Sequence, residues 1–166
     1  MRFAVIYLLH GKWGSPAGTV NKIQKAIEPL NPGVKFVRPL LPHHDPKCPA
    51  EKSVEFLRKL RIPEGSLLVG VSLGGLAAAK LQEESRPDLH VICISSPTVT
   101  IAGDLELKKK MPNRIAFYSM ADDMISGRVE KWSQLAEACE LPWLTHDTDA
   151  HIDKLTPLIQ EYIKTS

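Results

Sequence analysis

Short apolar runs alternate with amphipathic stretches along the whole chain. The segment from Phe3 to Leu9 is continuously apolar, whereas Val20 to Ile27 repeats its apolar residues at helical spacing. Alternating units of this kind are typical of a parallel sheet whose two faces are both covered by helices. The pattern therefore predicts an α/β fold, built as a three-layer α/β/α sandwich around a mostly parallel sheet.

Six strands and five helices follow from this pattern. The expected strands are Phe3–Leu9, Lys35–Arg38, Ser66–Gly70, His90–Ser95, Arg114–Ser119 and Trp143–Thr145. The expected helices are Val20–Ile27, Ala50–Leu60, Leu73–Glu84, Val129–Cys139 and Ile152–Lys164. The connection from Pro97 to Pro112 is short and polar, so we expect a fold without a lid domain.

Length, charge and cysteine content restrict the class of protein further. A chain of 166 residues with 43% hydrophobic content can bury one core, which predicts a single domain over residues 1–166. The net charge is +2, and the basic run at 108–110 has no interleaved aromatic residues, so we expect no nucleic-acid partner. No apolar run reaches membrane-spanning length, and the run at 3–9 is too short for a secretion signal. Three widely spaced cysteines, Cys48, Cys93 and Cys139, favour a reducing compartment, hence a cytoplasmic location.

The segment Gly70-Val71-Ser72-Leu73-Gly74 fits the G-x-S-x-G pattern at the junction of an expected strand and an expected helix. In that context the pattern indicates a nucleophile elbow, a sharp turn that exposes the serine hydroxyl above the sheet. The alternatives are a structural turn or a helix N-terminus that binds an anion. We interpret Ser72 as a nucleophile.

A serine nucleophile needs a histidine to accept its proton and a carboxylate to orient that histidine. Candidates lie after the fifth and sixth expected strands, at the carboxyl end of the sheet where such sites collect. They are the carboxylates Asp122 and Asp123 and the imidazoles His146 and His151. His146 lies near an expected strand end, where a buried structural histidine is common, so we favour His151 beside the last helix.

The ordered set of a His10-Gly11 loop, the Ser72 elbow, an acidic loop and a late histidine resembles the α/β hydrolases. More narrowly, it is similar to the small lidless serine hydrolases related to retinoblastoma-binding protein nine. The resemblance implies Ser72 as nucleophile, His151 as general base and Asp122 as orienting acid, since the spacing from Asp122 to Ile125 matches the family. It also implies an oxyanion hole formed by the backbone N–H of Leu73 and that of Lys12 or Trp13.

These residues predict a serine hydrolase that acts on a small-molecule carboxylic ester, or another acyl substrate, through an acyl-enzyme. The Trp13 ring either binds the substrate or closes the core at the sheet edge. We expect no cofactor and no metal, because adjacent histidines such as His43 and His44, with Asp45 and Cys48 nearby, do not readily converge on one ion.

Two non-hydrolytic functions compete with this interpretation. One is a noncatalytic binding protein that keeps the hydrolase scaffold. The other is a flavodoxin-like phosphate binder that uses the turn from Gly70 to Gly75 as an anion cradle. The second lacks both a G-x-x-x-x-G-K-[ST] loop and a dinucleotide-binding fingerprint.

Overall fold

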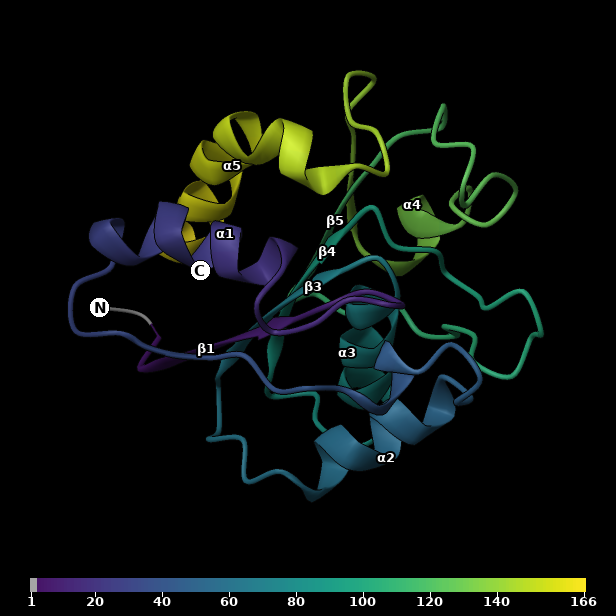
Figure 1. The fold of residues 1–166 in the computed structure, drawn as a ribbon, viewed down its shortest axis with the longest axis horizontal. Coiled ribbons are helices and arrows are strands. Elements are labelled where there is room, and N and C mark those ends of the chain that lie inside the picture. The colour runs from purple at the N-terminus through teal and green to yellow at the C-terminus, as the bar shows by residue number, and fades with distance from the viewer. Residues whose placement is uncertain (1–2) are drawn as a thin grey trace.

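The fold is a twisted parallel sheet between two layers of helices (Figure 1). The computed structural model describes residues 3–166. Within these residues the sheet has six strands in the order β2-β1-β3-β4-β5-β6, and every neighbouring pair is parallel. The strands are β1 Val5–Leu9, β2 Lys35–Val37, β3 Leu67–Val71, β4 His90–Ile94, β5 Arg114–Tyr118 and β6 Glu137–Glu140.

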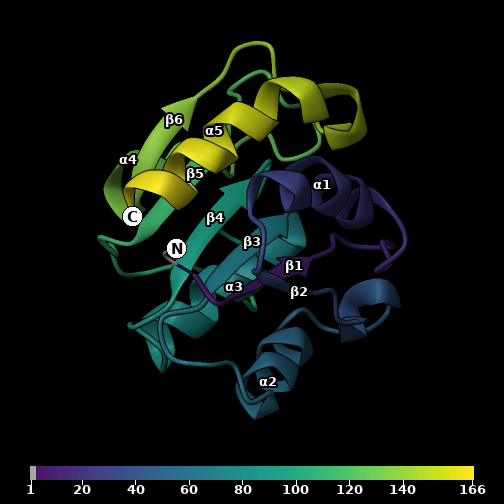
Figure 2. The same ribbon diagram turned by 90° about the vertical axis from the view of Figure 1, so that its left-hand side faces the viewer.

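Helices α1 and α5 cover one face of the sheet, and α2 and α3 cover the other, as Figure 2 shows from the side. Side chains alternate between the two layers along each strand: in β1, Ile6 and Leu8 join the α1/α5 core, whereas Tyr7 and Leu9 join the α2/α3 core. The helices are α1 Thr19–Ile27, α2 Glu51–Lys59, α3 Leu73–Glu84, α4 Trp132–Leu135 and α5 Ile152–Thr165. The three-layer α/β/α architecture expected from the sequence is confirmed.

The last third of the chain differs from the prediction. The expected helix Val129–Cys139 is only the single turn α4, and the sixth strand is Glu137–Glu140 instead of Trp143–Thr145. The cause is the position of β6 at the sheet edge, where Glu137 and Glu140 are exposed and the strand carries no continuous apolar run. As a result, residues 141–147 form a loop after the sheet.

The topological switch point of the sheet, where the strand order reverses its direction, lies between β1 and β3. From β1 the chain moves outward to β2, whereas from β3 it moves in the opposite direction to β4. The loops that follow β1 and β3 therefore diverge at the carboxyl end of the sheet, where ligand sites of open α/β sheets are found. Ser72 follows β3 directly, and His10 follows β1 directly.

No lid domain lies over this end of the sheet in the part of the chain from residue 3 onward. Among the same residues, no helix combines the length and the apolar character needed to cross a bilayer.

Candidate active site

The turn from β3 into α3 holds Ser72 in a strained backbone conformation. Its φ and ψ are 52° and −121°, a region that non-glycine residues rarely adopt. The flanking glycines permit the turn to be tight: a Cβ on Gly70 would lie 2.3 Å from the backbone nitrogen of Gly75, and one on Gly74 would lie 2.3 Å from the carbonyl oxygen of Leu9. The G-x-S-x-G spacing is therefore a steric requirement of this turn.

Ser72 is the first member of a hydrogen-bonded chain of three side chains. Its Oγ lies 3.1 Å from Nε2 of His146, and Nδ1 of His146 lies 2.9 Å from Oδ2 of Asp122. The other carboxylate oxygen of Asp122 accepts the backbone N–H of Met124 at 3.1 Å. The Asp122 side chain is 1% exposed and that of His146 is 26% exposed, so the chain runs from the interior to the surface. This is the arrangement of a nucleophile, a base and an orienting acid.

The structure does not bring His151 to Ser72. The Nε2 atom of His151 lies 2.8 Å from Oγ1 of Thr145, and its ring packs on Trp143 with centroids 5.5 Å apart. The expected place of His151 beside the Ser72 hydroxyl is instead taken by His146. Of the two candidate acids, Asp122 reaches the histidine, whereas Asp123 is exposed.

The position of β6 accounts for the difference between the expected and the observed place of the two histidines. With a strand at 143–145, His146 would stand at a strand end and His151 in the loop. Because β6 ends at Glu140, His146 instead lies well inside the loop that crosses the end of the sheet, and His151 is the residue before α5. The sequence contains both histidines, but only the true end of β6 distinguishes them.

Two backbone segments next to Ser72 supply candidate oxyanion donors. The N–H of Leu73 is at the first position of α3, where a helix offers it no acceptor. In the loop after β1, the N–H of Gly14 bonds to the carbonyl of Gly11 at 3.0 Å, and this turn leaves the N–H groups of Lys12 and Trp13 out of its own hydrogen bond. The loop touches the elbow, since a Cβ on Gly11 would lie 3.3 Å from that of Ser72.

Large apolar side chains stand exposed on the loops around this end of the sheet. Trp13 is 70% exposed and has a positive φ of 60°, so it does not close the core. Leu40, after β2, and Met120 and Met124, after β5, are also exposed. The loops that follow β1, β2 and β5 thus each carry an exposed apolar side chain.

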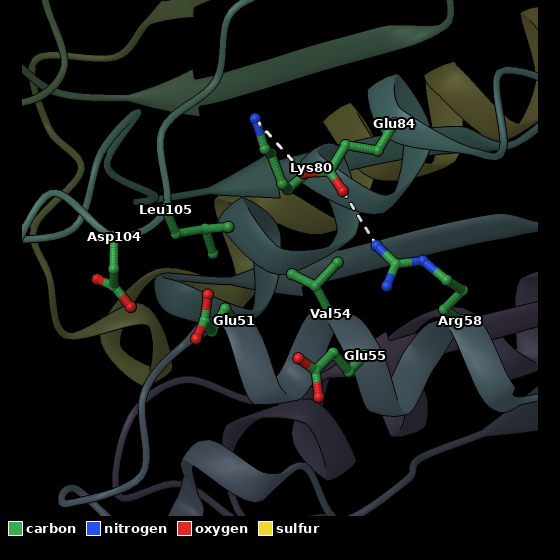
Figure 3. A pocket seen from close by; sticks show the side chains of 8 residues that line it. All are labelled: Glu51, Val54, Glu55, Arg58, Lys80, Glu84, Asp104 and Leu105. Carbon is green, nitrogen blue, oxygen red and sulfur yellow. Dashed lines mark hydrogen bonds and ion pairs between the residues drawn. The ribbon is translucent and has the colours of Figure 1, made fainter.

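Neither of two cavities elsewhere in the molecule overlaps this site. One, of about 230 Å³, lies between α2 and α3 and is lined mainly by charged side chains (Figure 3). Both of its cations pair with one lining carboxylate: Arg58 lies 3.0 Å from Glu84, and Lys80 lies 3.6 Å from the same group. Within residues 3–166 no three His, Cys, Asp or Glu side chains are placed to hold a metal ion, the cluster near His43 included.

Solved structures with the same architecture include proteins described as hydrolases. An α/β hydrolase from a sediment metagenome of the lagoon of Mar Chica, Morocco, aligns over 98% of this chain and 91% of its own, with a TM-score of 0.72 and 18% identity. A pyrethroid hydrolase from Sphingobium faniae JZ-2 covers 98% of both chains with a TM-score of 0.66 and 14% identity. The ydeN gene product of B. subtilis covers 97% of this chain and 99% of its own, with a TM-score of 0.74 and 15% identity.

Sequence comparison gives one family. No curated protein sequence matches the chain. The model of the family described as Uncharacterised protein family (UPF0227) matches residues 4–116, which include the loop after β1, the Ser72 elbow and most of the sheet. The chain therefore belongs to the family UPF0227 and has the α/β-hydrolase fold.

Proposed function

We propose that this protein is a serine hydrolase that cleaves carboxylic esters through an acyl-enzyme on Ser72. The observation that carries the proposal is the continuous hydrogen-bonded chain from Ser72 Oγ through His146 to Asp122. In the first step the Ser72 hydroxyl attacks the ester carbonyl while Nε2 of His146 takes its proton, and Asp122 stabilises the imidazolium. His146 then protonates the leaving alcohol, and water, activated by the same nitrogen, releases the acid.

The strained backbone at Ser72 supports a chemical role over a purely structural turn. A non-glycine residue at φ 52° costs of order 1–3 kcal/mol and persists where the surrounding structure holds it for a function. A binding protein that merely kept this scaffold would have no use for a serine held there, nor for a histidine whose second nitrogen bonds to a buried carboxylate. The oxyanion is assigned to the N–H of Leu73 and to that of Lys12 or Trp13.

The substrate is a small ester with an apolar acyl or alcohol group. The exposed Trp13 ring, on the loop that carries the second oxyanion donor, is assigned to binding that group, together with exposed Met124, whose backbone bonds to Asp122. No lid domain covers Ser72 among residues 3–166, so we propose that soluble molecules reach the serine directly. The triad supplies all the groups that the reaction needs, so the proposal includes no metal and no cofactor.

The first test uses a fluorophosphonate probe followed by mapping of the adduct by mass spectrometry. We expect one phosphonylated residue, Ser72, in the folded wild-type chain and none in Ser72→Ala. Folded wild-type protein that the probe leaves unlabelled at Ser72 would favour the noncatalytic binding function instead.

The second test separates paired residues by hydrolysis of p-nitrophenyl acetate. We expect His146→Ala to lower kcat by about 10⁴-fold or more, as removal of a triad base does, while His151→Ala changes kcat less than about threefold. The carboxylates form the same kind of matched pair: we expect Asp122→Asn to lower kcat strongly and Asp123→Asn, at its exposed neighbour, to leave kcat nearly unchanged. Loss of activity in His151→Ala with an active His146→Ala would contradict the assignment.

A further inference from the structure

A second buried histidine, His43, lies beneath the loop after β1 and takes no part in the triad. It belongs to the short helical turn Pro42–His44 and is 0% exposed. Its Nε2 lies 2.7 Å from the carbonyl oxygen of His10, and its Nδ1 lies 2.8 Å from Oγ of Ser53, a buried residue of α2. Both ring nitrogens of this buried side chain thus have defined partners.

The partners determine where the protons are. A carbonyl oxygen only accepts, so Nε2 of His43 carries a hydrogen, and Nδ1 accepts the Ser53 hydroxyl. His10 has the opposite tautomer: its Nε2 accepts the backbone N–H of Leu41 at 2.8 Å, so its Nδ1 donates to the carbonyl of Gly11 at 2.8 Å. Burial lowers the pKa of both imidazoles, which keeps the pair neutral.

The two histidines fix two consecutive peptide groups of the loop. The carbonyl of His10 is held by His43, and that of Gly11 by the His10 ring and the N–H of Gly14. Because a trans peptide is planar, a fixed carbonyl also fixes the direction of the N–H across the same bond. The network therefore sets the direction of two N–H groups: that of Gly11 through the bond from His43, and that of the next residue, Lys12, through the bonds from the His10 ring and Gly14. Of these two donors, Lys12 is the one that the sequence already marked as an oxyanion candidate.

We infer that His43, held by Ser53, is a positioning residue for the oxyanion hole, and that Lys12 supplies its second N–H donor. This inference rests on the proposed function. His43 does not touch the reacting atoms; it acts through the backbone of His10, on the loop that packs directly against Ser72. An oxyanion donor that is lost costs about 100- to 1,000-fold in rate, so a displaced loop reduces kcat with little change in KM.

The test compares two amide substitutions of His43 in hydrolysis of p-nitrophenyl acetate. Glutamine can bring its amide nitrogen close to the place of Nε2 and donate to His10, whereas asparagine is too short. We expect His43→Gln to keep kcat within about threefold of the wild type and His43→Asn to lower it by about tenfold or more, both with KM nearly unchanged. Asn31→Leu is the control, because Asn31 is a buried amide bonded to a backbone carbonyl far from the site.

Equal kcat values for the two amide variants, or an equal loss in Asn31→Leu, would overturn the inference. If His43→Asn does not fold, Ser53→Ala decides: we expect a several-fold lower kcat at unchanged KM, and an unchanged kcat would overturn the role of the network. A wild-type chain that neither hydrolyses the ester nor is labelled at Ser72 would overturn the proposed function and this inference together. If the wild type hydrolyses the ester and both His43 variants keep its kcat, the inference alone would be overturned and the proposed function would stand.

Discussion

Among single residues, Thr148 and Thr19 show how much the hydrogen-bond partner of a threonine hydroxyl matters. Thr148 is 3% exposed, and its Oγ1 has no hydrogen-bond partner among the described residues. Thr19 donates its hydroxyl to Oδ1 of Asp149 at 2.6 Å, which ties α1 to the turn that follows the His146 loop. A buried polar group without a partner costs about 1–3 kcal/mol, whereas a paired one contributes about 1 kcal/mol.

The two threonines therefore predict opposite effects of the same substitution. We expect Thr148→Val to raise the free energy of unfolding by about 1 kcal/mol, since valine fills the same volume without the hydroxyl. Thr19→Val, the matched control, is expected to lower it by about 1–2 kcal/mol because the bond to the Asp149 carboxylate is lost. Urea denaturation measures both free energies of unfolding. If Thr148→Val lowered the free energy of unfolding as much as Thr19→Val does, the Thr148 hydroxyl would have a stabilising partner after all.

At the scale of elements, a buried ion pair joins α3 to β5. Arg114 is fully buried, and its guanidinium contacts Glu83 at 3.2 Å and the carbonyl oxygens of Ala79 and Leu135 at 2.9 and 3.0 Å. These bonds connect α3, β5 and the end of α4. The adjacent Glu84 pairs instead with Arg58 on the surface, where both side chains are more than two-fifths exposed.

Two neighbouring glutamates thus form a matched pair of substitutions. We expect Glu83→Gln to lower the free energy of unfolding by about 3 kcal/mol, because it leaves the Arg114 charge buried without its counter-charge. Glu84→Gln should cost less than about 1 kcal/mol, as is usual for exposed pairs. Equal and small effects in thermal and urea unfolding would show that the Arg114 carbonyl contacts alone balance its charge.

The more deeply a strand is buried, the better its position can be predicted from the sequence. The interior strands β3, β4 and β5 are apolar on both faces, and their bounds agree with the sequence pattern within one residue. The edge strand β6 has exposed glutamates and overlaps the expected helix Val129–Cys139. Ser72 could be located from its spacing because the elbow needs its glycines. His146 could not be distinguished from His151, since their order along the loop carries no information about which one folds back over the sheet.

The network around His43 had no signal in the sequence. Adjacent histidines followed by Asp45 and Cys48 suggest a metal cluster or a polar loop, but His43 is buried and His44 is exposed. Only the packing of the turn Pro42–His44 against α2 and the loop after β1 places His43 between Ser53 and His10. Such a role depends on contacts between three separate segments and is visible only in the folded chain.

At the scale of the whole molecule, the same buried histidine makes stability depend on pH. Burial lowers the pKa of His43 from 6.5 to about 4, and the neighbouring imidazoles of His10 and His44 act in the same direction. The unfolded chain therefore binds a proton at this residue below pH 6.5, whereas the folded chain does not until about pH 4. The contribution of His43 to the free energy of unfolding is therefore fully present above pH 6.5 and is lost as the pH falls toward 4.

We expect the free energy of unfolding to decrease by about 3 kcal/mol between pH 7 and pH 4 through His43, with a further loss from His10, whose pKa burial also lowers. Asp88 acts at lower pH, because its bond to Arg86 lowers its pKa from 3.8 to about 2, so its contribution to stability is lost as the pH falls from 3.8 to about 2. Urea unfolding at half-unit pH steps measures the slope, and His43→Gln, which has no titrating group, should show a shallower one. Identical slopes for His43→Gln and the wild type would mean that His43 takes up its proton equally in the folded and unfolded states and does not contribute to the pH dependence of stability.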